Sequence, residues 1–295
     1  MPASIFQSLP FKKVLITGAT GYIGKSLLTK LLELKCDITC LNSSQPLEDD
    51  FKNFDVTHIT YTGNIASVVP AFENGRFDYI FHLAGYQATK LNAEELNTTL
   101  SSNIIFGSHL LEIARHYDAE HFIYAESFFQ FDENGSYLPR NIYAASKQAF
   151  SDILLSYSLD GLKSTSLVLF DVYGPADSRD KLFNRLEKAS KSSQELALTP
   201  GNQKHYAIYI SDVVAAFCFA AEDQTTNSFN RYWVAGEGIT LKQTIEQWCK
   251  IIQKALSIKW GGVDYFPNQV LQPFIGEKVP GWSAEVFLEE GLKKI

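Results

Sequence analysis

Short runs of β-branched and aromatic residues alternate with longer helical patterns along the first half of the chain. Leucines at helical spacing follow the first run, another apolar stripe extends from Asn103 to Tyr117, and a further helix is expected to begin near Tyr143. This alternation predicts an α/β fold with a doubly wound parallel sheet. Six runs are expected to be strands: residues 14–17, 37–42, 58–62, 78–84, 121–126 and 164–170.

The second half of the chain has a different character, because glycine and proline divide it into shorter elements. We expect residues 1–170 to form the sheet domain and residues 171–295 to form mainly a smaller lobe over the sheet. Segments at about 205–235 are expected to return to the sheet domain. The length of 295 residues, about twice that of a usual single domain, fits a core with an added lobe.

Composition argues against several classes of protein. The chain has 26 Lys and Arg against 33 Asp and Glu, a net charge of −7, and no basic run that could neutralise a row of phosphates, so we expect no nucleic-acid partner. The longest apolar run, residues 213–221, is far shorter than the roughly 20 residues that span a bilayer. With no secretory signal readable, we expect a soluble, cytoplasmic protein without a membrane partner. The cysteines and histidines lack metal-ligand spacing, so we expect core thiols and no catalytic metal.

Three glycines lie between the first strand and the leucine-rich helix, in the segment TGATGYIG at 17–24. A plain strand-to-helix turn, which is the alternative, needs only one glycine. Three allow a tight turn, close approach of a pyrophosphate to the backbone, and close packing of the helix on the strand, with the helix N-terminus facing the anion. The loop predicts a dinucleotide site formed by these residues: Gly18, Gly21, Tyr22, Ile23 and Gly24.

The Gly-x-x-Gly-x-x-Gly spacing resembles the extended short-chain dehydrogenase/reductase family, which includes sugar-nucleotide epimerases, dehydratases and reductases. In that family Asn103 would open a helix, and Tyr143 and Lys147 would form a Tyr-x-x-x-Lys motif. The resemblance implies a Rossmann-like dinucleotide-binding domain, a substrate-binding C-terminal lobe and a homodimer formed through helices of the sheet domain. Four more segments resemble family motifs: HLAG at 82–85, LVLFDVYGP at 167–175, AIYISDVV at 207–214 and PGW at 280–282.

Tyr143 and Lys147 are four residues apart, so on a helix they lie on one face. An ammonium beside a tyrosine stabilises the phenolate and brings its pKa of about 10 nearer to neutral pH. The family implies Tyr143 as proton donor, Lys147 as a further ligand of the nicotinamide ribose, and Ser127 as the hydrogen-bond partner of the reacting oxygen. The alternatives are a chance pair on an amphipathic helix and a serine that only caps the strand end.

Phe128 and Phe129 follow Ser127, at the positions where dehydratases of the family carry an Asp-Glu pair. A phenylalanine cannot transfer a proton, so dehydration is disfavoured.

Asn42 ends the second strand, where an acidic residue would bind the adenosine ribose of NAD and repel a further phosphate. Without that carboxylate, Asn42, Ser43 and Ser44 could receive a 2′-phosphate, so NADPH is the expected cofactor and NADH the alternative. The alternative is that Asn42 simply replaces the acid, with little selectivity between the two cofactors. The resemblance assigns further cofactor contacts to these residues: Asn64, Ile65, Leu83, Ala84 and Gly85.

A reductase consumes NADPH, whereas an epimerase regenerates its NAD in each turnover. We therefore expect reduction of a nucleotide-linked 4-keto-6-deoxy sugar in deoxyhexose biosynthesis for surface polysaccharides. Nucleotide-sugar 4-ketoreductases, a subfamily that includes the CDP-abequose synthases, are the group that the chain resembles most. The alternatives are a 4-epimerase with tightly bound NAD and a non-catalytic NADP sensor, although sensors typically lack the tyrosine and lysine.

Members of the family often bind the substrate diphosphate with an Arg seven residues before the residue that matches Asp212. Here His205 occupies that position, with Lys204 beside it, and Lys181 or Arg179 could supply charge instead. The alternative is that these are solvated surface charges. The candidate substrate-binding residues are Tyr86, Phe128, Phe129, Asp171, Lys181, Lys204 and His205.

Overall fold

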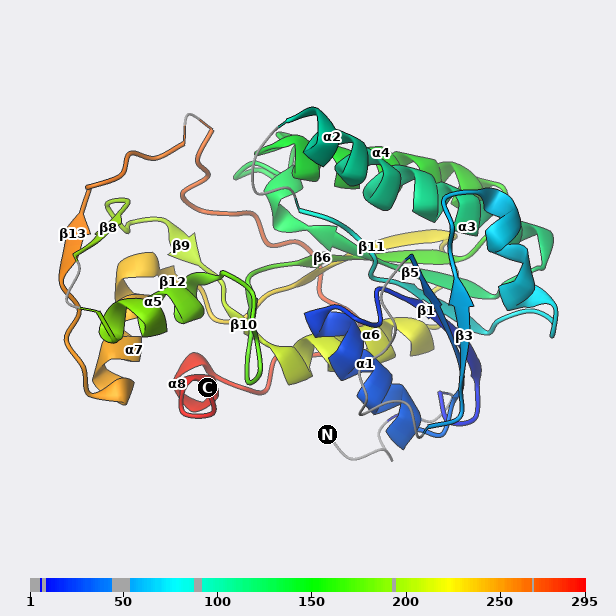
Figure 1. Ribbon diagram of the computed structural model, residues 1–295, viewed down its shortest axis with the longest axis horizontal. Helices are drawn as coiled ribbons and strands as arrows, with labels where there is room; N and C mark the ends of the chain where they lie inside the picture. Colours follow the sequence, from blue (N-terminus) through cyan, green and yellow to red (C-terminus); the bar gives the residue numbers. More distant parts are fainter. Residues whose placement is uncertain (1–5, 7–8, 44–53, 88–91, 193–194, 267) are drawn as a thin grey trace.

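The computed structural model describes residues 6, 9–43, 54–87, 92–192, 195–266 and 268–295 (Figure 1). Seven parallel strands form its main sheet: β1 (Lys13–Thr17), β2 (Asp37–Asn42), β3 (Val56–Thr60), β4 (Tyr79–His82), β5 (His121–Ser127), β6 (Ser164–Leu169) and β11 (Phe229–Val234). They lie in the order β11-β6-β5-β4-β1-β2-β3, so the winding reverses between β1 and β4. The predicted α/β fold with a doubly wound parallel sheet is confirmed.

Helices cover both faces of the sheet (Figure 1). One face carries α2 (Ala93–Leu100), α3 (Phe106–His116) and α4 (Ile142–Leu159), and the other carries α1 (Tyr22–Glu33) and α6 (Ile210–Glu222). The predicted leucine stripe is the buried face of α1, where Leu27, Leu28 and Leu31 are inaccessible to solvent. Burial of this stripe against the sheet and α6 fixes α1 directly behind the glycine loop.

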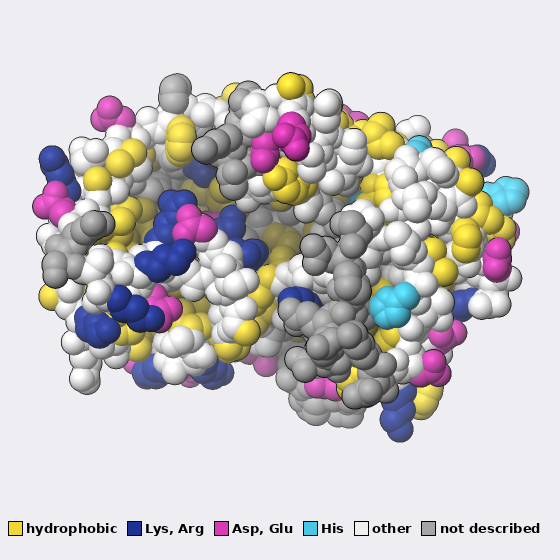
Figure 2. Space-filling model, viewed as in Figure 1, with side chains coloured by type: hydrophobic (Ala, Val, Ile, Leu, Met, Phe, Trp, Pro, Cys, Tyr) yellow, Lys and Arg dark blue, Asp and Glu magenta, His cyan; other side chains and the backbone are white. Residues whose placement is uncertain are grey.

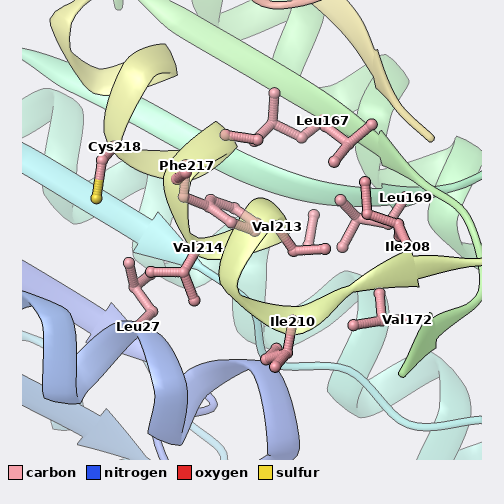
Figure 3. Packing of buried hydrophobic residues seen from close by; sticks show 14 of the residues in the cluster. Leu27, Leu167, Leu169, Val172, Ile208, Ile210, Val213, Val214, Phe217 and Cys218 are labelled. Atoms are coloured by element: carbon pink, nitrogen blue, oxygen red, sulfur yellow. The ribbon is translucent and has the colours of Figure 1, made fainter. Parts of the chain in front are cut away.

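The apolar run at 213–221 belongs to α6, which lies between the sheet and α1. Figure 3 shows Val213 and Phe217 of α6 among the leucines of β6, with Leu27 of α1 close to Val214. Neighbouring elements bury α6 on nearly every side, which explains why its residues are apolar nearly all round. It has 13 residues, and none of the helices in the described part of the chain is long and apolar enough to cross a bilayer.

A smaller lobe lies beyond the carboxyl ends of β4, β5 and β6 (Figure 1). Its helices are α5 (Leu182–Ser190), α7 (Leu241–Ile252) and α8 (Leu288–Leu292). Short strand pairs complete it or join it to the sheet domain: β7 (Val172–Tyr173) with β10 (Ile208–Tyr209), β9 (Lys204–His205) with β12 (Ile239–Thr240), and β8 (Leu196–Leu198) with β13 (Ile258–Trp260). Sequence analysis did not single out β11, which pairs with β6 in the main sheet although 59 residues lie between the end of β6 and its start.

The expectation that Asn103 opens a helix is wrong. The helical path begins ten residues earlier with α2, because the side chain of Asn92 accepts a hydrogen bond from Glu95 N and caps its first turn. Asn103 lies within the π-helical turn η5 (Ser101–Ile105) that joins α2 to α3. Its buried amide donates to Tyr86 O and Ser146 Oγ and accepts from Tyr86 N, so it ties the segment after β4 to α4.

Candidate active site

A cavity of about 700 Å³ lies between the carboxyl ends of the central strands and the lobe. In open α/β sheets this is the edge at which ligands bind, next to the reversal of strand order. Figure 2 shows Lys and Arg side chains gathered around the hollow on the lobe side. The cavity wall brings together Ser127, Tyr143 and Lys147 of the sheet domain with Lys181 and His205 of the lobe.

The predicted trio comes from two elements. Tyr143 and Lys147 lie one turn apart on α4, whose start is fixed by a hydrogen bond from Ala144 N to the side chain of Asn141. Ser127 is the last residue of β5, and its side chain is hydrogen-bonded to Tyr143. The Lys147 ammonium lies 5.9 Å from the centre of the Tyr143 ring. A hydroxyl, a phenol and an amine therefore face one cavity.

Burial governs the charges of the trio. It lowers the pKa of Lys147 to about 8, which the Glu126 carboxylate partly opposes. It raises the pKa of Tyr143 to about 12, although the hydrogen bond with Ser127 and the charge of Arg179 act in the opposite direction. The expected lowering of the Tyr143 pKa by Lys147 is thus wrong for the protein alone, because desolvation outweighs nearby charge. At neutral pH Tyr143 keeps its proton and can act as an acid.

Ser127 caps a turn at the end of β5, which sequence analysis gave as the alternative to a hydrogen bond with the reacting oxygen. Its Oγ accepts a hydrogen bond from Phe129 N, and its backbone N donates to the side chain of Gln130, so it caps the 3₁₀ turn η6 (Phe128–Gln130). Gln130 is buried and is held in turn by Gln148 of α4. Oγ donates its own proton to Tyr143 in the protein alone, and a substrate oxygen in the cavity could accept that proton instead.

Aromatic rings form the wall beside Ser127. Phe128 stacks on Phe170, with ring centres 4.5 Å apart and planes 11° apart, and it also contacts Phe129. The Arg140 guanidinium lies 4.5 Å from the centre of the Phe129 ring. This wall is apolar and carries no group that transfers a proton.

Basic side chains surround Asp171 at the lobe end of the cavity. His205 Nε2 lies 3.5 Å from Asp171 Oδ2. Burial acts to raise the pKa of Asp171, but the hydrogen bond from His205 and the charges of His205, Lys181 and Arg140 lower it overall. Arg140 lines the cavity and was missed by sequence reasoning, because the turn before α4 carries no motif that marks it.

The other predicted substrate contacts differ in placement. Lys181 and Lys204 line the cavity, and their amines donate to Gln87 Oε1 and to Gly238 O. Arg179 also lines the cavity; its guanidinium donates two hydrogen bonds to Asp177 and lies over the Tyr22 ring. Tyr86 is not among the residues that line this cavity, and its hydroxyl donates to Glu95.

The glycine loop fits a dinucleotide. Gly18 has a φ of +71°, and a Cβ there would lie 2.7 Å from Ala84 N, while a Cβ at Gly24 would lie 2.0 Å from Gly18 O. These two glycines are required by the packing of strand, loop and helix. Gly21 stands at the N-cap of α1, and a Cβ there would come no closer than 3.3 Å to a described atom. The first amides of α1, at Tyr22 and Ile23, lack helical partners and can bind phosphate oxygens.

The remaining predicted cofactor residues lie along the same edge. Leu83 and Gly85 line the cavity, and Ala84 N donates to Thr17 Oγ1. Asn42 Oδ1 is buried and has no hydrogen-bond partner within the described residues, so it is an acceptor that a ribose hydroxyl could use. Ser43 is exposed, and Ser44 lies outside the described residues. The Asn64 side chain caps the 3₁₀ turn η3 (Ile65–Ser67), which leaves Ile65 on the surface.

A family model for the NAD dependent epimerase/dehydratase family matches residues 14–236, which is more than half of the chain. The chain belongs to this family. The match runs from β1 through the glycine loop, the trio and α6 to the end of β11.

Relatives of the chain in this family cover almost its full length. CDP-abequose synthase from Salmonella muenchen is 25% identical over 291 residues, which are 96% of this chain and 97% of that protein. Its presence bears out the predicted resemblance to that subfamily. Among solved structures, the fold is shared with UDP-glucose 4-epimerase from Thermus thermophilus in complex with NAD, at 22% identity and a TM-score of 0.79 over 96% of this chain and 97% of that one. It is also shared with UDP-glucuronic acid 4-epimerase from Bacillus cereus in complex with UDP-glucuronic acid and NAD, at 20% identity and a TM-score of 0.82 over the same shares.

Proposed function

We propose that the protein is a nucleotide-sugar 4-ketoreductase, which reduces a nucleotide-linked 4-keto-6-deoxy sugar with NADPH in deoxyhexose biosynthesis for surface polysaccharides. The observation that carries the proposal is the pairing of a complete reducing trio with an apolar wall. Ser127, Tyr143 and Lys147 face the cavity beside Phe128 and Phe129. The nearly full-length likeness to CDP-abequose synthase supports it.

The trio supplies a hydrogen bond, a proton and a charge. Ser127 donates a hydrogen bond to the ketone oxygen and polarises the carbonyl. As the carbon–oxygen π bond breaks and a carbon–hydrogen bond forms, Tyr143 transfers its proton to that oxygen, which gives an alcohol. The Lys147 ammonium then stabilises the phenolate until solvent returns the proton. When bound, the reduced dinucleotide supplies the hydride for this step.

The proposal also assigns the parts of the dinucleotide to residues at the carboxyl ends of β1 and β2. The α1 N-terminus after Gly21 would hold the pyrophosphate, and Asn42 and Ser43 would face the adenosine ribose. Because no carboxylate ends β2, a 2′-phosphate would meet no repulsion there, which favours NADPH over NADH.

The aromatic wall is the reason that we propose a sugar without a hydroxyl at C6. A C6 hydroxyl packed against Phe128 and Phe170 would lose its hydrogen bonds to water, at a cost of roughly 1 to 3 kcal/mol, whereas a C6 methyl would lose none. The wall also lacks the acid and base that would form a keto sugar from its parent. A separate dehydratase would therefore have to supply the substrate.

The experiment is a screen of CDP-, dTDP- and GDP-linked 4-keto-6-deoxyhexoses, with NADPH absorbance as the readout. We expect oxidation of NADPH with at least one of them and none with the parent nucleotide hexoses. Conversion of a UDP-hexose to its C4 epimer without net loss of NADPH would replace the proposal with a 4-epimerase. That second candidate is favoured by the shared fold with UDP-glucose 4-epimerase.

We also propose that the protein is a cytoplasmic homodimer joined through helices of the sheet domain. Apolar side chains are exposed along this layer, with Leu159 of α4 75% and Ile105 of η5 45% accessible. Leu159→Glu would place a charge in this apolar interface, so the variant should sediment as a monomer instead of a dimer. An unchanged dimer would place the interface elsewhere.

A further inference from the structure

Glu126 precedes Ser127 on β5, and its side chain is completely buried. Side chains alternate along a strand, so Glu126 points to the face covered by α4, with Tyr124. Its carboxylate accepts a hydrogen bond from Ser151 Oγ of α4. It also pairs with Arg231 of β11, whose Nε lies 3.0 Å from Oε2 and whose Nη2 lies 3.2 Å from Oε1.

The cluster of Glu126, Ser151 and Arg231 is closed, because Arg231 Nη2 also donates to Ser151 Oγ at 2.8 Å. Its three members come from β5, α4 and β11. Ser151 follows Lys147 by four residues, one turn further along the same helix. The cluster therefore links the strand that ends in Ser127 to the helix that carries Tyr143 and Lys147.

We propose that Glu126 is a positioning residue, which with Ser151 and Arg231 holds Ser127 in register with Tyr143 and Lys147 and holds a negative charge behind the Lys147 ammonium. The inference rests on the proposed function, because the trio is taken to be the reacting set. Glu126 is buried behind the trio, so it would act on the reaction only through the side chains of the trio, which contact the substrate.

Stability alone is a weak reason for such a cluster. Two buried ions lose their hydration, and a well-packed apolar pair of similar volume is often as stable or more so. The cluster lies directly behind the trio, where fixed geometry and charge affect reactivity. The location of the cluster is therefore better explained by a role in orienting the trio than by a role in stabilising the fold.

Several ionisable groups face Lys147. They are Tyr124 and Glu126 of β5, Tyr143 of its own helix, and His82 of β4, whose pKa burial and Lys147 lower to about 3 so that it is neutral. Burial lowers the pKa of Lys147 to about 8, and Glu126 is the group that opposes it. Removal of the carboxylate charge must therefore lower this pKa further, so that less ammonium is present at neutral pH.

The test compares Glu126→Gln with a matched control, Glu120→Gln. Both changes remove one carboxylate charge next to an arginine, but Glu120 pairs with Arg76 at the surface, before the opposite end of β5. Glutamine keeps the shape and the acceptor oxygen of Glu126. Ser151→Ala is the second variant, which cuts the link to α4 and leaves the charge, and it carries the test if Glu126→Gln fails to fold.

Two readouts separate this inference from the proposed function. The first is the titration of Lys147 followed by NMR of ¹³Cε-labelled lysine, with the resonance assigned by its loss in Lys147→Arg; this needs no substrate. We expect the midpoint to fall by about one pH unit in Glu126→Gln and to stay unchanged in Glu120→Gln. An unchanged midpoint in Glu126→Gln would overturn the electrostatic part even if no keto sugar is ever reduced.

The second readout is turnover with the best substrate of the screen. We expect kcat to fall about tenfold in both Glu126→Gln and Ser151→Ala. KM should stay within about twofold of wild type, because the Glu126 side chain is completely buried and Ser151 does not line the cavity. The pH dependence of kcat should shift only in Glu126→Gln. Wild-type kcat in both variants would overturn the positioning role.

Discussion

The proposed function gives the cavity a catalytic end, at Ser127, Tyr143 and Lys147, and a lobe end, at Asp171, Lys181 and His205. The two ends differ in how the protein holds their charged groups. At the catalytic end Lys147 is buried and donates to Ala125 O at 3.0 Å, and Ser127 is fixed by the side chain of Gln130. At the lobe end Lys181 donates to the exposed Gln87, and His205 lies 3.5 Å from Asp171. Under the proposed function, the first arrangement would fix geometry for the reaction, whereas the second would offer positive charge to the substrate diphosphate. Changes at the catalytic end should therefore affect kcat, and changes at the lobe end should affect KM.

The largest effect is expected from Tyr143→Phe at the catalytic end. The change removes one hydroxyl and keeps the ring in place, so the fold and cofactor affinity should be nearly unchanged. Loss of the general acid should lower kcat by about two to four orders of magnitude. Steady-state kinetics with a cofactor titration on the same sample measures both. Turnover near the wild-type rate would remove Tyr143 from the mechanism.

Lys147→Met, at the same end, should abolish activity and yet raise the free energy of unfolding. The pKa of Lys147 in the folded protein is about 8, below the ordinary lysine value of 10.5, so below pH 8 its burial costs free energy. That cost falls as pH rises from about 8 to 10.5, because the unfolded chain then binds a proton that the folded chain lacks. Methionine carries no such cost, so the variant should be more stable at pH 7, by on the order of 1 to 3 kcal/mol, and inactive. Urea unfolding at pH 7 and pH 10 measures this, and equal stability at both pH values in the wild type would contradict it.

Lys181→Gln tests the lobe end. If Lys181 serves as a point charge for the substrate diphosphate, KM for the nucleotide sugar should rise about tenfold while kcat stays within about twofold. Lys188→Gln is the matched control, because Lys188 lies on α5, the helix that begins directly after Lys181, pairs with Asp180 and does not line the cavity. Equal KM values for the two variants would mean that Lys181 is a solvated surface charge.

Asn42→Asp is expected to have the smallest effect, because Asn42 ends β2 and is not among the residues that line the cavity. A carboxylate there would repel a 2′-phosphate and should lower the preference for NADPH over NADH by a few fold to about tenfold. Fluorescence titration of both cofactors gives the ratio. A wild-type preference for NADH would weaken the reductase proposal itself.

The elements that sequence analysis predicted correctly are those whose signals are local. The glycine triplet, the leucine stripe of α1 and the four-residue spacing of Tyr143 and Lys147 each lie within one or two turns of chain. Arg231 and Glu126 could not be paired in this way, because 105 residues separate them and only the order β11-β6-β5 brings them together. The same holds for Asn103, whose role depends on contacts with Tyr86 and α4.

Charges were harder to predict than positions. Sequence reasoning placed an ammonium beside a phenol and expected the phenol to become more acidic, but it could not include burial, which raises the pKa of Tyr143 to about 12. It also sought the ligands of the substrate diphosphate in the lobe alone and missed Arg140, which lines the cavity and acts on the charge of Asp171 from the turn before α4.

The central claim is that Ser127, Tyr143 and Lys147 reduce a ketone at C4 of a nucleotide-linked sugar. It is tested most directly with NADPH deuterated at the transferable position of the nicotinamide and a nucleotide-linked 4-keto-6-deoxyhexose, with the product analysed by NMR and mass spectrometry. The account predicts one deuterium at C4 of the product for each NADPH consumed, and no such product with Tyr143→Phe on the same time scale. A C4 epimer formed from a nucleotide hexose, without deuterium and without NADPH consumption, would contradict it.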